Sequence, residues 1–280
     1  MRELSTKKIT EAVRGLCIEA NTNLSADVEV ALNKALKDEE SPNGREILRQ
    51  LIHNAGIARK EKRPICQDTG SVVVFIELGQ EIRLVDGSLE EAVNEGVSRG
   101  YTEGYLRKSI VSDPLRRQNT GDNAPAFTHV RLVPGDKLTI NLMCKGGGAE
   151  NCSAINFFKP TSSHDEISQF IIKTVELAGP NACPPVIVGV GIGGNFELAP
   201  LTAKKALLRE IGHYNSDHDL AKWEKELLVK INRLGIGPMG LGGRATALAV
   251  NIETAPCHIS QLPVAVNIEC HAHRARKVEL

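Results

Sequence analysis

The chain has 280 residues, of which 41% are hydrophobic and 24% are charged, a composition typical of a globular protein with enough apolar side chains for a sizeable core. Its 34 lysine and arginine residues equal its 34 aspartate and glutamate residues in number, so net charge points to neither nucleic acid nor a membrane surface as a partner. No apolar run approaches the roughly 18 residues that span a bilayer, and the N-terminal segment lacks the apolar stretch of a signal peptide. We therefore expect a cytoplasmic protein.

The N-terminal part of the chain predicts helices. Apolar residues recur at helical spacing over 9–20, 28–36 and 47–55, which is the pattern of one buried face. After residue 62 the pattern changes to runs of β-branched residues, beginning with SVVVFIEL at 71–78. We expect a helical N-terminal region (1–62) followed by an α/β body (63–280), together forming one continuous domain.

The body alternates between strand and helix patterns. Short runs rich in β-branched and apolar residues predict strands at 71–78, 127–133, 137–144, 186–190, 246–254 and 262–270. Helical spacing predicts a helical segment broken by glycines at 88–111 and helices at 163–179, 201–212 and 216–235. The second of these has a capping box, Ser163 with Glu166, and a closing glycine, Gly179. The fold class expected is mixed α/β (α+β).

Seven cysteines stand at wide spacings. An odd number in a chain without a secretion signal indicates free thiols, metal ligands or catalytic groups rather than a disulfide framework. Cys17 falls on an apolar helical face and reads as a core residue. Cys66, Cys183 and Cys270 fall in loops or at strand ends, where thiolates can share a cleft. The remaining three are Cys144, Cys152 and Cys257.

Two motifs suggest other chemistries. The C-terminal CHAHR, with Cys257 and His258 upstream, offers cysteine and histidine ligands for zinc, although no ordinary zinc-finger spacing is present. The segment GVGIGG (189–194) matches a dinucleotide fingerprint. It does not open a helix directly, and no acidic residue ends a following strand at the usual distance. We interpret it as a tight loop where the backbone comes close to another group.

Anion binding has its own candidates. Three consecutive glycines in CKGGGAEN, Gly146, Gly147 and Gly148, expose backbone N–H groups suited to a carboxylate, or else form a flexible turn. Arg107 and Arg244 each could bind a carboxylate with two hydrogen bonds. A single arginine is more often a solvated surface charge, so these two need support from other residues.

Taken together, the motifs resemble a known family. PICQDTG, LRKSIVSDPLRRQNTGDNAPA, CKGGGAEN, ACPPVIVGVGIGG, GIGPMGLGG and TAPCHISQLPVAVNIECHAHR follow one another in this order. The set resembles the α subunit of the class I, iron–sulfur-dependent fumarate hydratases and of the related L-tartrate dehydratases. The resemblance runs from about residue 10 to the C-terminus.

The resemblance implies a [4Fe–4S] cluster with one iron that has no protein ligand. It places the three thiolate ligands at Cys66, Cys183 and Cys270. It places the substrate at Gln67, Asp68, Arg107 and the glycine loop 146–148. Asp68 is implied as the proton donor to the departing hydroxyl, with His258 as a partner that orients it or relays its proton.

The resemblance also implies a second chain. Single-chain members continue into another domain that carries further substrate-binding residues and the base that deprotonates carbon. A β subunit, in an α2β2 or similar assembly, would supply these. The implied activity is the citric acid cycle interconversion of fumarate and L-malate, with L-tartrate dehydration as the alternative. A zinc-bound structural or regulatory subunit and a nicotinamide-dependent dehydrogenase stay open as alternatives of other classes.

Overall fold

The computed structural model describes residues 1–280 and has the mixed α/β fold that the sequence predicts. Its internal contacts group the chain into two compact units. Unit 1 comprises Met1–Ser25, Asn54–Gly147 and Arg274–Leu280, and unit 2 comprises Ala26–His53 and Gly148–His273. The division into a helical region (1–62) and a body (63–280) stays a prediction; the contacts group the chain in another way.

Unit 1 is built on a four-stranded sheet in the order β10-β5-β2-β4. Its strands are β2 (Ser71–Gly79), β4 (Phe127–Val133), β5 (Leu138–Lys145) and β10 (Ala275–Glu279). The central strand β2 runs antiparallel to β5 and parallel to β4. The two strands joined by the turn after Val133 are therefore not neighbours. A small parallel pair, β1 (Arg2–Ser5) and β3 (Ile82–Val85), completes the strands of this unit.

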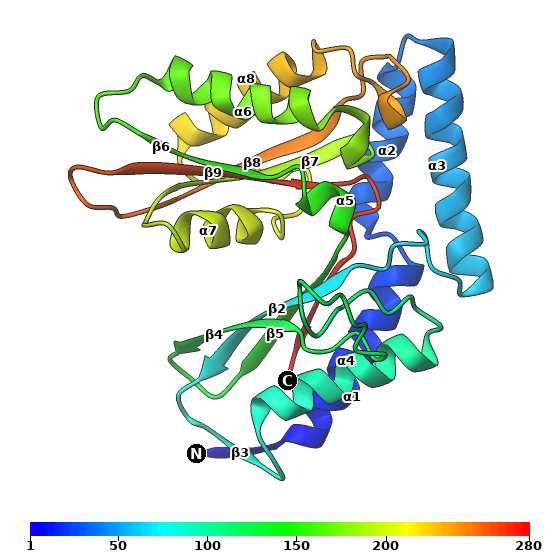
Figure 1. The fold of residues 1–280 in the computed structure, drawn as a ribbon, viewed down its shortest axis with the longest axis vertical. Helices are drawn as coiled ribbons and strands as arrows, with labels where there is room; N and C mark the ends of the chain where they lie inside the picture. Colours follow the sequence, from blue (N-terminus) through cyan, green and yellow to red (C-terminus); the bar gives the residue numbers. More distant parts are fainter. The chain divides into compact units, whose positions relative to one another are not determined.

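Two helices, α1 (Thr6–Thr22) and α4 (Leu89–Glu103), pack on one face of this sheet and on each other (Figure 1). Alternate residues of β2 and β5 point into the shared apolar core, as the period of two in a strand requires. Gly96 of α4 brings the helices close, because an added Cβ would lie 2.7 Å from the Thr10 carbonyl oxygen.

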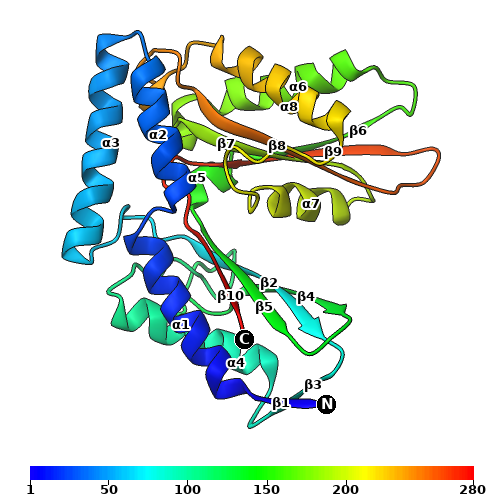
Figure 2. The same ribbon diagram turned by 180° about the vertical axis from the view of Figure 1, so that it is seen from behind.

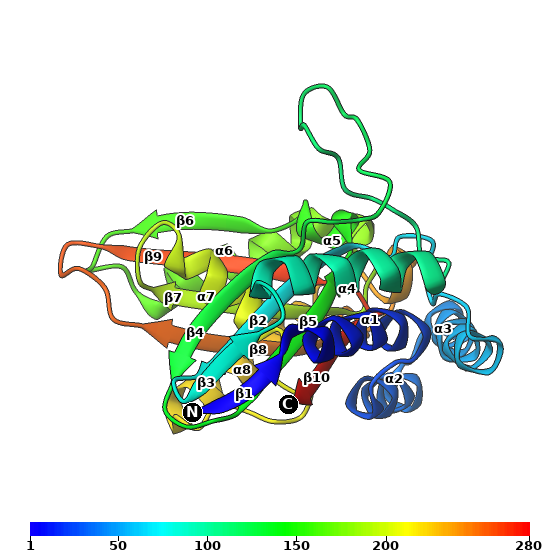
Figure 3. The same ribbon diagram turned by 90° about the horizontal axis from the view of Figure 1, so that it is seen from below.

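The helical segment predicted at 88–111 is broken at one of its glycines, Gly104, and the residues after it are not helical. The helix ends at Glu103, Gly104 caps it, and Tyr105 has a φ of +53°, a left-handed conformation that helices do not continue through. A long loop then connects α4 to β4, and Figure 3 shows it extending away from the strands before it returns. This loop carries Arg107.

Unit 2 contains a second four-stranded sheet, in the order β6-β9-β7-β8. Its strands are β6 (Ala154–Phe158), β7 (Val186–Gly193), β8 (Ala247–Ala255) and β9 (Leu262–Glu269). One face packs on α6 (His164–Ala178) and α8 (His218–Asn232), and the other on α7 (Leu198–Ala206), as Figures 1 and 2 show. The capping box predicted at Ser163 and Glu166 is confirmed.

The remaining helical elements are short or peripheral. α2 (Ala26–Asp38) belongs to unit 2, α3 (Pro42–Glu61) runs from unit 2 into unit 1, and α5 (Gly147–Glu150) is a single turn. Two 3-10 turns are η1 (Gly179–Ala182) and η2 (Pro238–Gly240). None of the helices combines the length and the apolar character that crossing a membrane requires.

The GVGIGG segment is a strand, so its interpretation as a tight loop is wrong. The expected close approach of the backbone to another group is confirmed, because the backbone of α7 lies directly on β7. An added Cβ at Gly189 would lie 2.2 Å from the Ala203 carbonyl oxygen, and one at Gly191 would lie 2.2 Å from the Ala199 carbonyl oxygen. These glycines serve helix-on-sheet packing rather than a nucleotide phosphate.

This packing predicts a large effect for one methyl group. Gly189→Ala is expected to lower the free energy of unfolding by about 1–3 kcal/mol, because α7 must move away from the sheet. Urea denaturation followed by circular dichroism measures it. Gly56→Ala is the matched control, since no atom lies within 4 Å of its added Cβ; it should gain roughly 0.5–1 kcal/mol from helix propensity. Equal stability changes for the two variants would contradict the packing argument.

Candidate active site

Asp68 lies in the loop between α3 and β2, and two backbone N–H groups hold its carboxylate. Gly70 N donates to Oδ1 at 3.0 Å, and Gly147 N donates to Oδ2 at 2.8 Å. Donors on both oxygens fix the direction in which the carboxyl group points. The side chain is half-buried, so a fixed orientation is combined with access for a small molecule.

The main chain of this loop is anchored from the interior of unit 1. Tyr101 Oη of α4 lies 2.6 Å from the Thr69 carbonyl oxygen and 3.1 Å from that of Gly70, and donates to them. Burial raises the pKa of the Tyr101 hydroxyl, which keeps it a donor. Arg274, only 1% exposed, donates to the Asp68 carbonyl. Gly70 has a φ of +75°, and an added Cβ would lie 2.5 Å from a carbonyl oxygen of β5.

Arg107 stands just beyond the end of α4, and side-chain hydrogen bonds tie its segment to the loop before β2. Thr69 Oγ1 donates to the Arg107 carbonyl at 2.9 Å. Asn123 accepts from Ser109 N at 2.6 Å and donates to the Gly70 carbonyl at 3.1 Å. The Arg107 side chain is exposed and forms no ion pair within the chain. Hydrogen bonds therefore join the loop that carries the Asp68 carboxylate to the segment that carries the available Arg107 guanidinium. We call these two joined segments, 68–70 and 107–109, the frame.

One N–H group of the glycine loop is used within the chain. Gly147 opens the one-turn helix α5 and gives its N–H to Asp68. At Gly146 an added Cβ would lie 3.0 Å from the Arg274 guanidinium and 3.5 Å from the Asp68 carboxylate. The absence of side chains here lets the loop close against these two groups.

Cys66 belongs to unit 1, directly before the Asp68 loop. Its thiol is half-buried and donates to Gln67 Oε1 at 3.5 Å. Gln67 itself is exposed. The structure thus brings Cys66, Gln67, Asp68 and Arg107 onto neighbouring backbone of one unit.

Cys183 and Cys270 belong to unit 2, where a histidine joins their segments. Cys183 follows η1 in a left-handed conformation with a φ of +53°. Its carbonyl accepts from the backbone N of His271 at 3.4 Å and lies 2.9 Å from the His271 ring Nδ1. The residue after Cys270 is therefore bound to Cys183. Both thiols are half-buried, and no cysteine of the chain forms a disulfide.

The other cysteines make contacts of their own. Cys17 and Cys144 are fully buried in the core of unit 1, and their mutual hydrogen bond together with burial raises the pKa of the Cys17 thiol. The thiols of Cys152 and Cys257 donate to nearby carbonyls, each at 3.3 Å. The core assignment of Cys17 is confirmed. No group of three or more His, Cys, Asp or Glu side chains is arranged to hold a metal ion.

His258 lies in the turn between β8 and β9, in unit 2, and is exposed. Its ring Nδ1 accepts from the backbone N of Ser260 at 3.2 Å and lies 2.7 Å from the Ser260 hydroxyl. Because Nδ1 accepts a backbone N–H, a neutral ring carries its proton on Nε2. That nitrogen is the one available for proton exchange.

The sequence matches the fumarate hydratase (Fumerase) family over residues 10–279. The chain belongs to this family. The match covers nearly the whole chain, so the resemblance drawn from the six motifs is confirmed.

Several relatives carry the same name. A protein of Methanocaldococcus jannaschii, provisionally named L(+)-tartrate dehydratase subunit alpha, is 42% identical over 274 residues, covering 95% of this chain and 95% of its own. L(+)-tartrate dehydratase subunit alpha of Escherichia coli strain K12 is 33% identical over 277 residues, covering 98% of this chain and 91% of its own. The Shigella boydii protein of that name gives the same figures.

The sequence analysis did not identify the buried residues that hold the Asp68 loop in place. Tyr101, Asn123 and Arg274 are buried, and each bonds to backbone of the Asp68 loop. Asn123 and Arg274 lie inside the quoted motifs TGDNAPA and CHAHR, so their presence there was an available signal. Arg244, considered as a carboxylate clamp, instead pairs with Glu40 of unit 2.

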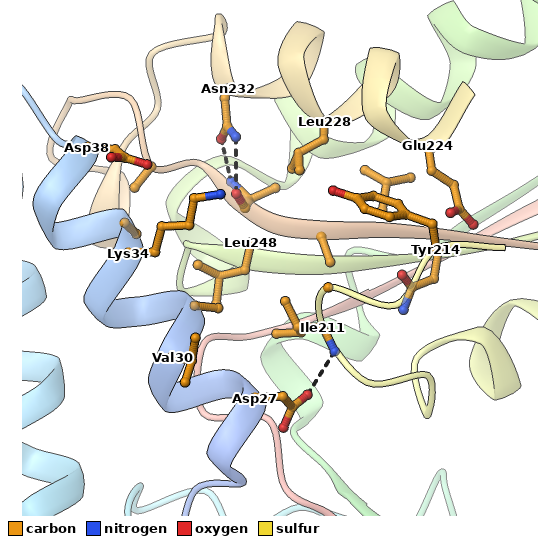
Figure 4. A pocket seen from close by; sticks show the side chains of 18 of the residues that line it. Asp27, Val30, Lys34, Asp38, Ile211, Tyr214, Glu224, Leu228, Asn232 and Leu248 are labelled. Carbon is orange, nitrogen blue, oxygen red and sulfur yellow. Dashed lines mark hydrogen bonds between the residues drawn. The ribbon is translucent and has the colours of Figure 1, made fainter. Parts of the chain in front are cut away.

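A cavity of about 340 Å³ lies in unit 2, between α2, α8 and the edge of β8. Figure 4 shows the side chains of Lys34 and Tyr214 beside it, with Val30, Ile211 and Leu248 among its apolar walls. Of the residues considered for binding substrate or cluster, only Arg244 lines it. Side chains occupy both ends of the free β8 edge: Asn232 Oδ1 accepts from the backbone N of residue 247, and Glu224 Oε1 accepts from that of residue 252.

Proposed function

We propose that this chain is the α subunit of an iron–sulfur-dependent hydro-lyase that interconverts fumarate and L-malate. The observation that carries the proposal is the frame in unit 1, which holds the Asp68 carboxylate and presents the free Arg107 guanidinium. A hydro-lyase acting on a dicarboxylate needs both a group that exchanges a proton and a cation that binds a carboxylate. Membership of the fumarate hydratase family supports the reaction class.

The thiols fit the proposed [4Fe–4S] cluster. Iron–sulfur clusters are held by cysteine thiolates, and Cys66, Cys183 and Cys270 form no disulfide, are half-buried and lie outside the helices and strands. When bound through these three, the cluster would supply a Lewis acid for the departing hydroxyl. A reducing compartment suits such thiols, and the cytoplasm stays the proposed location.

The chain's own residues have separate tasks in this proposal. Asp68 gives a proton to the hydroxyl as it leaves, or removes one from water in the reverse direction. Arg107 binds a substrate carboxylate and stabilises the negative charge that develops there when the neighbouring carbon is deprotonated. Gln67 adds a polar contact, and His258, with its Nε2 available, orients Asp68 or relays its proton.

The base that deprotonates carbon is assigned to a β subunit. Relatives of this chain are named as alpha subunits, a name that supports a partner chain for this one as well. The proposed assembly is α2β2 or similar. On its own, the chain is expected to bind the cluster and to catalyse poorly.

Dehydration of L(+)-tartrate is the second candidate, favoured by the names of the relatives. Tartrate and malate both present a hydroxyl beside a carboxylate, and they differ by one additional hydroxyl. The residues described in unit 1 serve either substrate.

Anaerobic co-expression with the candidate β subunit tests the proposal. The expected result is a brown complex that contains iron and acid-labile sulfide and converts fumarate to L-malate, while the purified α chain with its cluster is far slower. Faster turnover of L(+)-tartrate than of fumarate would establish the second candidate. A colourless zinc protein without hydro-lyase activity would instead support a structural or regulatory subunit. Equal rates with and without the β subunit would contradict the two-chain proposal.

A further inference from the structure

Two hydrogen-bonded bridges join the backbone next to Asp68 to the backbone next to Arg107. We propose that Asn123, which forms one of them, is a positioning residue that fixes the distance between the Asp68 carboxylate and the Arg107 guanidinium. The inference rests on the proposed function, in which both groups act on one substrate. Asn123 touches neither side chain and acts through Gly70 and Ser109.

The burial of Asn123 makes this bridge a fixed part of the frame. The residue is 0% exposed, and both ends of its amide are used: Nδ2 donates to the Gly70 carbonyl and Oδ1 accepts from Ser109 N. Gly70 O also lies 3.1 Å from Tyr101 Oη, whose single proton is shared with the nearer Thr69 carbonyl oxygen. Removing the donor half of the amide would leave the buried Gly70 carbonyl with only this shared hydroxyl, and removing the acceptor half would take away the partner of Ser109 N; either loss is costly.

The backbone on either side of Asn123 is also held. Ala124 N donates to the Asp122 carboxylate at 3.0 Å, and Ala126 N donates to Asn94 of α4 at 2.9 Å. Asn123 has a φ of +66°, a conformation that asparagine tolerates better than most residues. The backbone that carries the Asn123 side chain is therefore fixed, and the two amide hydrogen bonds hold Gly70 and Ser109 at fixed positions relative to it.

Only a group with a donor at one end and an acceptor at the other can make this bridge. A carboxylate of the same size keeps the bond from Ser109 N but turns a lone pair toward the Gly70 carbonyl. Asn123→Asp should therefore loosen the bridge on the Gly70 side while it retains side-chain volume and tolerance of positive φ. Misplacement of a reacting group by about 1 Å can lower a rate about 100-fold.

Asn215 in unit 2 provides a matched control. Its amide is also used at both ends, donating to the Ile252 carbonyl at 2.8 Å and accepting from Asp217 N at 2.9 Å. It is half-buried, and its hydrogen bonds involve neither the Asp68 loop nor residues 107–110. Asn215→Asp therefore makes the same chemical change without touching the bridge.

Two measurements test the proposal on the full chain. Amide hydrogen exchange of the purified chain without cluster should be about tenfold faster over residues 107–110 in Asn123→Asp, with exchange across β2 unchanged. In the complex with the β subunit, kcat should fall about 10- to 100-fold, with a smaller change in KM. Asn215→Asp should keep the exchange of residues 107–110 and kcat within about twofold of wild type.

The second bridge offers an independent check. Thr69→Val removes the hydroxyl that donates to the Arg107 carbonyl, and Thr69→Ser keeps it. Combining Thr69→Val with Asn123→Asp should lower kcat by more than the product of the single effects, because each bridge compensates for loss of the other. Thr69→Ser, which keeps the donating hydroxyl, should have a kcat much closer to wild type than that of Thr69→Val.

Several outcomes would overturn the proposal. These are unchanged exchange and kcat in Asn123→Asp, the same losses in Asn215→Asp, or strictly multiplicative effects of the two bridges. Faster exchange over 107–110 in an assembly that converts no dicarboxylate would support the bridge and refute the proposed function. The two failures are therefore distinguishable.

Discussion

Cys183→Ser is expected to abolish binding of iron and acid-labile sulfide together with activity. Serine matches cysteine closely in size and suits the left-handed conformation at position 183 no worse, but its hydroxyl is a poor ligand for iron–sulfur clusters. Iron and sulfide analysis after anaerobic reconstitution measures the loss, and the same result is expected at Cys66 and Cys270. Far-ultraviolet circular dichroism should stay unchanged, because Cys183 is half-buried and outside both hydrophobic cores.

The chain supplies its own controls for this experiment. Cys257→Ser and Cys152→Ser change thiols that donate to carbonyls in their own turns, and a hydroxyl can replace either. Both variants should keep iron content near wild type. Full cluster occupancy in Cys183→Ser, or its loss in Cys257→Ser, would refute the proposed ligand set.

Asp68→Asn is expected to keep the cluster and to lower kcat by about 10²- to 10⁴-fold, the usual range for loss of a general acid. An amide cannot give up a proton to the departing hydroxyl. It also turns one N–H toward the backbone donors at Gly70 and Gly147, and therefore loses one of the two bonds that orient the side chain. Steady-state kinetics of the complex with the β subunit, normalised to iron content, measures the change.

Asp113→Asn is the matched control. The Asp113 carboxylate also accepts from two backbone N–H groups, those of Leu115 at 2.9 Å and Arg116 at 2.6 Å. It lies in the long loop after α4, outside the proposed site. Both N–H groups donate to the same oxygen, Oδ1, so the amide variant can keep both bonds, and kcat should stay within a factor of about two. An Asp68→Asn enzyme as active as Asp113→Asn would exclude Asp68 as the proton donor.

The sequence predicts those parts of the fold that depend on local patterns. The strand at 127–133 and the capping box at Ser163 follow from alternation and from cap chemistry, and both are present. The strands β6 and β10 were missed, because AINFF and ARKVE carry too few residues to distinguish a strand from a loop. Their strand conformation comes from pairing with β9 and β5, which are distant in sequence.

The same distinction between local patterns and tertiary contacts applies to the candidate site. Motifs identify Cys66, Asp68 and Arg107, because the chemistry of these residue types is visible in the sequence. They do not identify the groups that hold Asp68 in position, since an asparagine or a tyrosine gains that role only from tertiary contacts. Asn123 and Tyr101 reach Gly70 from 53 and 31 residues away, distances that no local pattern encodes.

The interleaving of the two units has a consequence for the order of folding. Strand β10 joins the sheet of unit 1 from the far end of the chain, and Arg274, just before it, donates to the Asp68 carbonyl across 206 residues. Contacts of such sequence separation close long loops and form slowly. We therefore expect the Asp68 loop to mature late, after β2, β4 and β5 have paired. A folding intermediate with an ordered sheet would still lack its proton donor in position, so gain of activity should lag behind gain of secondary structure during refolding.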